Sequence, residues 1–467
     1  MKLFGTDGIR GTAGTAPLEP KTVARVGAAI ARAMSASAQG ASTFAQGASA
    51  DRPAGQAPGH RLRFVIGRDT RESGTWIEEE LARGLTSEGA TVVSAGVVPT
   101  PAVAYLARTE GFDAGIVISA SHNPYEDNGI KVFGGAGTKL TEQLEASVEQ
   151  RVAAPGWSVP DAPGRIDRHD LSDLSAHYVE HLDLIMKTAG RLAGSRIVID
   201  CANGATAGIA PPLFKALGFV VETLGIAPDG RNINLNCGST HLEGLSAAVV
   251  ASKARMGVAF DGDGDRALFV DHGGRVVDGD AVLLMAAIYL KEQGRLPGNA
   301  IVATVMSNIG LEIALRNRGI DMVRTAVGDK YVMEEMIKRG LALGGEQSGH
   351  VIFSEHLFTG DGLATALNVL RIMADTGQEL EQLAGALVSY PQVLVNVRVR
   401  EKTDLKTVPA IVDTMNRVEQ GLAGNGRLLV RYSGTEPLLR IMLEGKDDSE
   451  IRAWADEIAG VVRANLA

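Results

Sequence analysis

The sequence predicts three α/β domains with mostly parallel, mixed sheets, followed by a smaller C-terminal α+β domain. Its 467 residues correspond to about three or four domains of ordinary size. A unit of short apolar strand, helix, glycine and second strand occurs three times, and parallel strands connected by helices produce this order. The tail instead alternates valine with other residues over 393–399, as a half-buried strand does. We expect domains over residues 1–168, 169–275, 276–389 and 390–467.

The expected elements follow the chain in a regular order. Val23, Val26 and Ile30 have helical spacing after Pro20 and predict an amphipathic helix that ends near Met34. Residues 35–59 are almost entirely Ala, Ser, Gly, Gln and Pro, which predicts a flexible insertion with no assigned function. The repeated units predict strands over 63–67, 89–93, 196–200, 218–223, 300–304 and 319–323, each pair enclosing a helix. The tail predicts a strand over 393–399, a helix, two strands within 427–444 and a final helix around Trp454.

Composition and charge exclude several classes of protein. Forty-six basic against 55 acidic side chains give a net charge of −9, which argues against nucleic-acid binding and favours a small-molecule partner. The two cysteines, Cys201 and Cys237, match no metal or redox spacing, and a reducing cytoplasm fits them best. The longest apolar run, Ala281 to Leu290, is too short to span a bilayer. The residues after Met1 contain no apolar segment of the kind found in signal peptides, so we expect no secretory signal.

Glycine is unusually frequent: its 56 residues are about 12% of the chain, against a usual ~7%. Aromatic residues make up only 4%. Many glycines lie in polar loops after predicted strands, where ligands of α/β sheets bind. In the first such loop, a strand leads into Ser121, His122 and Asn123. This arrangement can present a serine nucleophile or a phosphoserine, although Ser-His-Asn-Pro is also ordinary turn chemistry. Lys131 can return to the same place as a cation or proton shuttle.

The second loop holds Asp261, Asp263 and Asp265 at alternate positions after a strand. Three converging carboxylates repel one another, and oxygen-only ligands favour Mg²⁺ or Mn²⁺ over zinc. An EF-hand is excluded because Arg266 occupies the glycine position and His272 the bidentate glutamate position. A dinucleotide-binding loop is excluded because Asp263 and Asp265 would repel a pyrophosphate. A solvated acidic turn remains the alternative.

Two further loops complete the set. Glu346 and Ser348, in Gly-Gly-Glu-Gln-Ser-Gly-His, can point to one face and bind sugar hydroxyls or an amine, although a plain turn also explains them. Arg431-Tyr-Ser-Gly-Thr-Glu-Pro, followed by Arg440, surrounds a hole of anion size with hydroxyls, backbone N–H groups and guanidinium. The chain lacks a P-loop motif, which argues against nucleotide hydrolysis.

Taken in order, Ser-Ala-Ser-His-Asn-Pro, Asp-Gly-Asp-Gly-Asp-Arg, Gly-Glu-Gln-Ser-Gly-His and Arg-Tyr-Ser-Gly-Thr-Glu-Pro closely resemble the α-D-phosphohexomutase superfamily. The resemblance covers nearly the whole chain. The opening Phe-Gly-Thr-Asp-Gly-Ile-Arg-Gly, with Gln347 and Gly434, is most similar to the bacterial members that interconvert glucosamine 6-phosphate and glucosamine 1-phosphate. It implies four domains around a central active-site cleft, one motif per domain, in a cytoplasmic enzyme that supplies amino-sugar nucleotides and cell-wall precursors.

The resemblance also implies roles for individual residues. Ser121 would carry the phosphoryl group, and one Mg²⁺ would be held by Asp261, Asp263, Asp265 and a phosphoserine oxygen. A glucosamine or glucose 1,6-bisphosphate would serve as intermediate or activator. The further catalytic residues implied are Arg10, His122, Lys131 and Arg266. The substrate-binding residues implied are Glu346, Ser348, His350, Gly328, Asp329, Lys330, Arg431, Ser433, Gly434, Thr435 and Arg440.

Two departures and several alternatives remain. Tyr432 stands where these mutases commonly have proline, and Lys330 stands where arginine is frequent. Within the superfamily, a phosphomannomutase or phosphoglucomutase is the first alternative. A metal-dependent sugar-phosphate phosphatase could use the same carboxylates but would leave Ser121 unexplained, and a non-catalytic sugar-phosphate sensor would leave the catalytic set unexplained. We expect a sugar phosphate as partner, no nucleic acid or membrane, and a monomer or homodimer.

Overall fold

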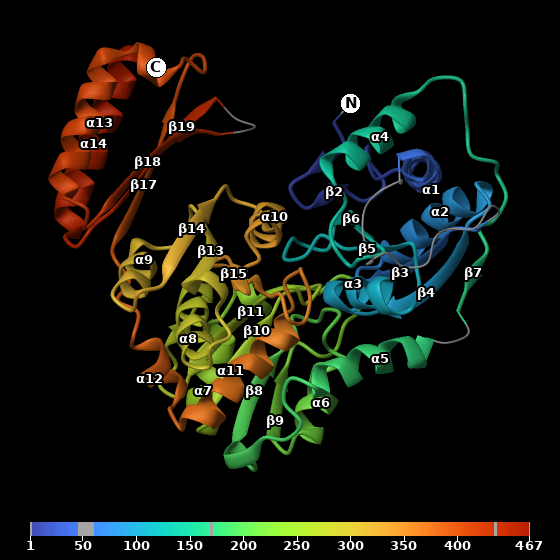
Figure 1. Ribbon diagram of the computed structural model, residues 1–467, viewed down its shortest axis with the longest axis horizontal. Coiled ribbons are helices and arrows are strands. Elements are labelled where there is room, and N and C mark those ends of the chain that lie inside the picture. Colours follow the sequence, from blue (N-terminus) through green and yellow to red (C-terminus); the bar gives the residue numbers. More distant parts are fainter. Residues whose placement is uncertain (1, 45–59, 169–170, 434–436, 467) are drawn as a thin grey trace. The chain divides into compact units, whose positions relative to one another are not determined.

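The computed structural model describes residues 2–44, 60–168, 171–433 and 437–466 of the chain (Figure 1). The chain forms two compact units. The first comprises Met1–Val305 and Val323–Ala384, and the second comprises Met306–Met322 and Gly385–Ala467. Within the described ranges, no helix combines the length and the apolar character that a membrane crossing requires.

The first sheet has seven strands in the order β1-β2-β6-β5-β3-β4-β7. Strand β3 pairs in parallel with β4 and β5, and β4 with β7, whereas β5, β6, β2 and β1 pair antiparallel in sequence across the sheet. Helices α1, α2 and α4 cover one face through a shared apolar core, and α3 covers the other. The bounds are β1 (Phe4–Gly5), β2 (Gly8–Thr12), α1 (Pro20–Phe44), β3 (Arg63–Arg68), α2 (Gly74–Ser87), β4 (Thr91–Val97), α3 (Thr100–Thr109), β5 (Ala114–Ile118), β6 (Asp127–Gly134), α4 (Glu142–Ala153) and β7 (Ile166–Asp167).

Helix α3 approaches the sheet closely because glycine faces it. A Cβ at Gly115 of β5 would lie 2.8 Å from a methyl carbon of Val103, which is closer than real Cβ contacts allow. The neighbouring side chains Ile116 and Ile118 point to the opposite face and join the core under α1 and α2. Glycine in this strand therefore fixes the close packing of the helix on the strand that leads to Ser121.

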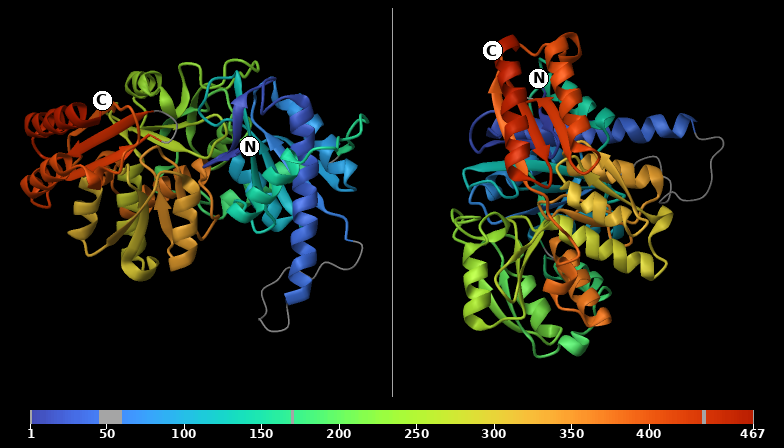
Figure 2. Two further views of the ribbon diagram at one scale, coloured as in Figure 1. Left: turned by 90° about the horizontal axis from the view of Figure 1, so that it is seen from above. Right: turned by 90° about the vertical axis from the view of Figure 1, so that its left-hand side faces the viewer.

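Helix α1 corrects one prediction. It begins at Pro20, as expected, but continues to Phe44 instead of ending near Met34 (Figure 2). The segment after Met34 contains Ala36, Ala38 and Ala41, and alanine has the highest helix propensity. Adding turns to a packed helix costs less than starting a new one, so the alanine-rich segment continues it. Residues 45–59 of the expected insertion lie outside the described residues.

The second sheet has the order β12-β11-β10-β8-β9 and the third β14-β13-β15-β16. Parallel pairs (β8 with β9 and β10, β13 with β15) are extended by antiparallel partners (β11 and β12, β16). The bounds are α5 (Leu171–Asp183), β8 (Arg196–Asp200), α6 (Ala210–Ala216), β9 (Val220–Leu224), α7 (Glu243–Ser252), β10 (Met256–Phe260), β11 (Ala267–Asp271), β12 (Val276–Val277), α8 (Gly279–Glu292), β13 (Ala300–Thr304), β14 (Asp321–Thr325), α10 (Asp329–Arg339), β15 (Leu343–Gly345), β16 (Val351–Phe353), α11 (Gly362–Thr376) and α12 (Leu380–Ala384). The strands predicted over 196–200 and 300–304 begin and end as expected.

The second unit contains a three-stranded antiparallel sheet in the order β17-β19-β18. Its elements are α9 (Ile309–Arg316), β17 (Gln392–Arg398), α13 (Pro409–Leu422), β18 (Arg427–Tyr432), β19 (Leu438–Glu444) and α14 (Asp448–Leu466). Apolar side chains of α13 and α14, including Ile411 and Ile458, pack on Ile441 of the central strand. This confirms the α+β arrangement expected for the tail. Among the described residues of both units, the short 3-10 helices are η1 (Gly190–Leu192), η2 (Gly238–Thr240), η3 (Pro297–Asn299) and η4 (Leu405–Thr407).

Candidate active site

Three of the predicted loops meet in the first unit around one pocket of about 390 Å³. The Ser121 loop follows β5, the aspartate loop follows β10 and the Glu346 loop follows β15. Each loop thus leaves the carboxyl end of a strand, where ligands of α/β sheets bind. The predicted site residues that line the pocket are Arg10, His122, Asp265, Arg266, Gly328, Asp329, Glu346 and His350.

Ser121 is buried and has a left-handed backbone, with φ of +54°. Its Oγ donates a hydrogen bond to Asp261 at 2.5 Å, and its N–H donates to the Ser119 hydroxyl at 2.9 Å. The glycine at position 262 allows this contact between two loops, because a Cβ there would lie 2.6 Å from the carbonyl oxygen of Ser121. The structure therefore places the predicted nucleophile directly against the predicted metal ligands.

The buried guanidinium of Arg71 binds the backbone of the Ser121 loop. Arg71 donates to the carbonyl oxygens of Ser121 (2.9 Å), Asn123 (2.8 Å) and Asp127 (2.9 Å), and to that of Pro124. Its Nε donates to Asp69 at 2.8 Å, and both side chains are fully buried. A single side chain thus fixes the curve of backbone that presents the serine hydroxyl.

Two further contacts tie this loop to its surroundings. The amide of Asn234 donates to the carbonyl oxygens of Ser121 at 2.9 Å and Asn123 at 3.0 Å. The Ser119 hydroxyl donates to Asp69 at 2.6 Å. Burial raises the pKa of Asp69 above its usual value, although the charge of Arg71 opposes this shift.

The three aspartates form a compact buried cluster. Their carboxylate oxygens lie within 4.8 Å of one another. Burial, followed by the charges of Asp265 and Asp263, raises the pKa of Asp261 well above its usual value. At Asp265 the opposite holds, because Lys131, His350 and Arg266 outweigh burial and lower its pKa to about 2.

Lys131, a residue of β6, contacts this cluster directly. Its ammonium lies 2.9 Å from Asp263, 3.0 Å from Asp265 and 3.0 Å from Asp7. Burial alone would lower the pKa of Lys131, but these carboxylates raise it well above its usual value. Lys131 is therefore a fixed cation in this arrangement.

The cluster fits a hard divalent cation. The Oδ1 atoms of Asp263 and Asp265 are buried and accept no hydrogen bond from the described residues. A buried carboxylate oxygen that accepts no hydrogen bond is costly, and a cation bound to it removes the cost. Oxygen-only ligands favour Mg²⁺ or Mn²⁺ over zinc, so the donor set is compatible with the expected ion.

Two arginines and a histidine surround the mouth of the pocket. Arg10 donates to the carbonyl oxygen of Ala120 at 2.7 Å and pairs with Asp7. Arg266 lies 3.8 Å from Asp265, and its N–H donates to Asp261 at 3.2 Å. Burial, followed by the charges of Arg266 and Arg10, lowers the pKa of His122 to about 4. His122 is therefore neutral at pH 7, and the two guanidinium groups place positive charge beside the pocket.

The segment Gly328–Lys330 contributes to another wall of the pocket through Gly328 and Asp329. The N–H of Gly328, a residue with φ of +135°, donates to Glu346 at 3.3 Å. Two expected residues behave differently. The ammonium of Lys330 lies 2.7 Å from Glu145, and Lys330 does not line the pocket. Ser348 is half-buried and also lies outside the lining. His350 lies in the wall, where its Nε2 accepts from the Gly360 N–H at 3.2 Å.

The predicted phosphate clamp belongs to the second unit. Arg431 of β18 lies directly opposite Arg440 of β19 in the antiparallel register. This register brings together two of the residues expected to bind a phosphate. The carbonyl oxygen of Ser433 accepts from Lys402 at 2.7 Å. Gly434 and Thr435 lie outside the described residues.

Several site residues were missed from the sequence. Asp69 and Arg71 follow a strand end, so the same signal that selected Ser121 could have found them. Asp7 lies inside a motif from which only Arg10 was selected. Lys139 and Asn234 carry no local signal, because their partners lie far away along the chain.

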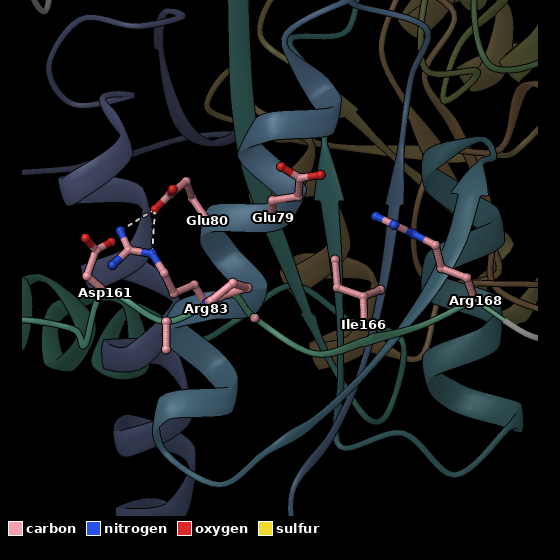
Figure 3. Close-up of a pocket in the computed structure, with 9 residues that line it drawn as sticks. Glu79, Glu80, Arg83, Asp161, Ile166 and Arg168 are labelled. Carbon is pink, nitrogen blue, oxygen red and sulfur yellow. Dashed lines mark hydrogen bonds and ion pairs between the residues drawn. The ribbon is translucent and has the colours of Figure 1, made fainter.

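A second hollow lies on the first domain beside α2 and is not part of this site (Figure 3). It measures about 570 Å³ and is lined by charged residues of both signs. Arg83 is paired with Glu80 across its wall. None of the described residues that line it presents a buried polar atom without a partner.

Comparison with known proteins matches this geometry. Models described as phosphoglucomutase/phosphomannomutase α/β/α domains I, II and III match residues 1–157, 176–274 and 278–390, and the C-terminal domain model matches residues 394–461. The chain belongs to the phosphoglucomutase/phosphomannomutase family. The predictions of a phosphohexomutase and of a four-domain architecture are thus confirmed.

Two relatives that cover nearly the whole chain bear the same name. "Phosphoglucosamine mutase" of Solibacter usitatus is 50% identical over 464 residues, covering 99% of each chain. That of Moorella thermoacetica is 48% identical over 451 residues, covering 96% of each. Among solved structures, a phosphoglucomutase/phosphomannomutase family protein from Burkholderia thailandensis is similar with a TM-score of 0.77 and 25% identity, covering 100% of this chain and 99% of that one. The family thus extends over all four domains.

Proposed function

We propose that the chain is a phosphoglucosamine mutase, which interconverts glucosamine 6-phosphate and glucosamine 1-phosphate in the cytoplasm. The hydrogen bond from Ser121 Oγ to Asp261, inside a buried cluster of three carboxylates, carries this proposal. It places a hydroxyl where it can hold a phosphoryl group beside a divalent cation. Full-length relatives with this name support the amino sugar as substrate.

The proposed reaction uses phosphoserine 121 as donor. The O1 hydroxyl of glucosamine 6-phosphate attacks the phosphorus, the bond from phosphorus to the serine oxygen breaks, and a 1,6-bisphosphate forms. The sugar then turns within the site, and its 6-phosphate returns to the Ser121 hydroxyl, leaving glucosamine 1-phosphate. No phosphoryl group is gained or lost in the complete cycle.

Positioning and charge neutralisation account for most catalysis of phosphoryl transfer. Asp261, Asp263 and Asp265 would hold one Mg²⁺, which would neutralise charge on the phosphoryl oxygens. Lys131, Arg266 and Arg10 provide positive charge from the chain itself. His122, beside Ser121 Oγ at 3.3 Å, orients the hydroxyl.

The substrate contacts form the second part of the proposal. Glu346, His350, Gly328 and Asp329, which line the pocket, would bind the sugar, with its amine near the carboxylates. Ser348 and Lys330 stay predicted sugar-binding residues although they lie outside the lining. The phosphate that does not react would bind to the residues of the clamp, which are Arg431, Ser433, Gly434, Thr435 and Arg440. We also propose the domain boundaries near residues 168, 275 and 389.

One assay tests the proposal. Phosphorylated protein with Mg²⁺ and a trace of glucose 1,6-bisphosphate is incubated with glucosamine, glucose or mannose 6-phosphate, and the 1-phosphates are followed by ³¹P NMR. We expect fastest turnover of glucosamine 6-phosphate and none with Ser121→Ala. Equal turnover of the three sugars would contradict the amino-sugar assignment and favour a phosphomannomutase or phosphoglucomutase. Release of inorganic phosphate as the main product would favour a phosphatase.

A further inference from the structure

A buried lysine links two carboxylates that line the substrate pocket. Lys139 lies just after β6, its side chain is only 9% exposed, and its ammonium lies 2.6 Å from Asp7 and 2.5 Å from Asp329. Both aspartates line the pocket, but Lys139 does not. Burial alone would lower the pKa of Lys139, but Asp329 and Asp7 raise it above its usual value. Lys139 is thus a charged bridge behind the pocket wall.

The bridge continues on both sides. Asp7 also contacts Lys131 at 3.0 Å, and Lys131 contacts the aspartates of the metal loop. Asp329 begins α10, and its carboxylate lies 3.5 Å from His350. Alternating charges therefore connect the carboxylates of the second domain, through the first domain, to the sugar-binding loop of the third.

We propose that Lys139 is a positioning residue that holds the Gly328–Lys330 loop in its substrate-binding position, an inference that rests on the proposed function. Because one ammonium touches both carboxylates, Asp7 and Asp329 lie at most about 5 Å apart and repel each other without it. Asp7 would keep Lys131 and Arg10 as partners. Asp329 would keep no described cation as partner, because the His350 Nε2 at 3.5 Å accepts a hydrogen bond from the Gly360 N–H. The third-domain side of the bridge is therefore the side that moves.

The position of Asp329 affects the sugar site directly. Gly328 precedes it and donates its N–H to Glu346, so a displaced loop also releases the carboxylate proposed to bind the sugar. The fold itself has a second tie at this place, because Lys330 of α10 pairs with Glu145 of α4 at 2.7 Å. Loss of Lys139 should therefore weaken substrate binding more than it weakens the fold or the metal site.

The test compares Lys139→Met and Lys139→Arg with Lys338→Met, a control at the exposed end of the same helix α10. We expect Lys139→Met to raise KM for glucosamine 6-phosphate at least tenfold and to change kcat less than threefold. Calorimetry on the Mg²⁺-loaded, dephosphorylated protein should show a rise in Kd of the same factor. Lys139→Arg should recover at least half of the loss on a logarithmic scale, and Lys338→Met should stay within twofold of wild type.

Further readouts separate positioning from structure. The rise in Tm on adding Mg²⁺ should be equal in Lys139→Met and wild type, because the metal carboxylates stay in place. A variant with a lower Tm but unchanged KM and Kd would overturn the inference, since Lys139 would then be only structural. A wild-type protein that neither converts nor binds glucosamine, glucose or mannose 6-phosphate would overturn the proposed function and this inference with it. If wild type acts on one of the other sugars, that sugar replaces glucosamine 6-phosphate in the comparison.

Discussion

Replacing Arg71 by methionine should strongly destabilise the first domain. The guanidinium is fully buried and pairs with the equally buried Asp69, and removing one partner of such a pair costs about 3–5 kcal/mol. The loop carbonyls lose less, because those of Ser121 and Asn123 also accept from Asn234. For a domain of about 150–250 residues, 1 kcal/mol shifts Tm by about 2–4 °C, so we expect a decrease of roughly 6–20 °C.

Thermal unfolding followed by circular dichroism measures this effect. The matched control is Arg63→Met, at the exposed start of the same strand β3, which should change Tm by no more than about 3 °C. Adding Asp69→Asn to Arg71→Met removes the unpaired buried charge and should recover part of the lost Tm. An Arg71→Met protein as stable as the Arg63→Met control would refute the reasoning, as would a double variant less stable than Arg71→Met alone.

Three other predictions concern pH and metal. Burial lowers the pKa of His356 to about 4, so the unfolded chain binds the proton first and the contribution of His356 to stability falls from about pH 6.5 towards pH 4. Between pH 7 and 5 this contribution decreases by about 2 kcal/mol, and the lowered pKa of His122 adds a separate loss. In urea unfolding, His356→Asn should reduce the total loss by about 2 kcal/mol, while an equal loss in variant and wild type would exclude this residue as a cause. Burial raises the pKa of Asp361 to about 6, so the contribution of its protonated form to stability is lost as pH rises from about 4 to 6. Asp361→Asn keeps an acceptor for Tyr178, and its free energy of unfolding should gain about 2 kcal/mol relative to wild type between pH 4 and 7. A difference between variant and wild type that stays the same from pH 4 to 7 would contradict the shift. Mg²⁺ at 100 times its Kd should stabilise the protein by about 2.7 kcal/mol, measured as a rise in Tm in a thermal shift assay. EDTA should reverse this rise, and Asp263→Asn should largely abolish it. The same rise in Tm in that variant would place the ion elsewhere.

Much of the site was predictable because it follows a local rule. Ser121, Asp261 and Glu346 each come shortly after an apolar strand, so strand and polar loop are neighbours in the sequence. The strands β5, β10 and β15 belong to three different sheets, so it is the packing of these sheets' domains within the first unit that brings the loops together. Local patterns therefore indicated the chemical groups and the edges of the sheets at which they lie.

The supporting contacts were not predictable in this way. Lys139 meets Asp7 and Asp329 only because three segments distant in the chain pack together. The ammonium of Lys330, expected at the sugar, instead pairs with Glu145 of α4, a helix with no predicted role. Ion pairs between distant segments depend on tertiary packing, which no local spacing records.

Helix α1 shows a different reason for error. The composition of the segment after Met34 resembles a linker, since it is rich in Ala, Ser and Gln. The same residues other than glycine are tolerated well in helices, and the first part of α1 is anchored by buried residues such as Val23 and Ile30. Composition alone could not distinguish an extension of a packed helix from a loop.

The backbone of Ser121 limits which residues can replace the nucleophile during evolution. Threonine would keep a hydroxyl that can be phosphorylated, but a β-branched residue is a genuine outlier at φ of +54°. Aspartate and asparagine tolerate this conformation better, although neither can form the same phosphate ester. A lineage that keeps this loop can therefore exchange serine for threonine only by rebuilding the turn, and the loop geometry preserves serine independently of its reactivity.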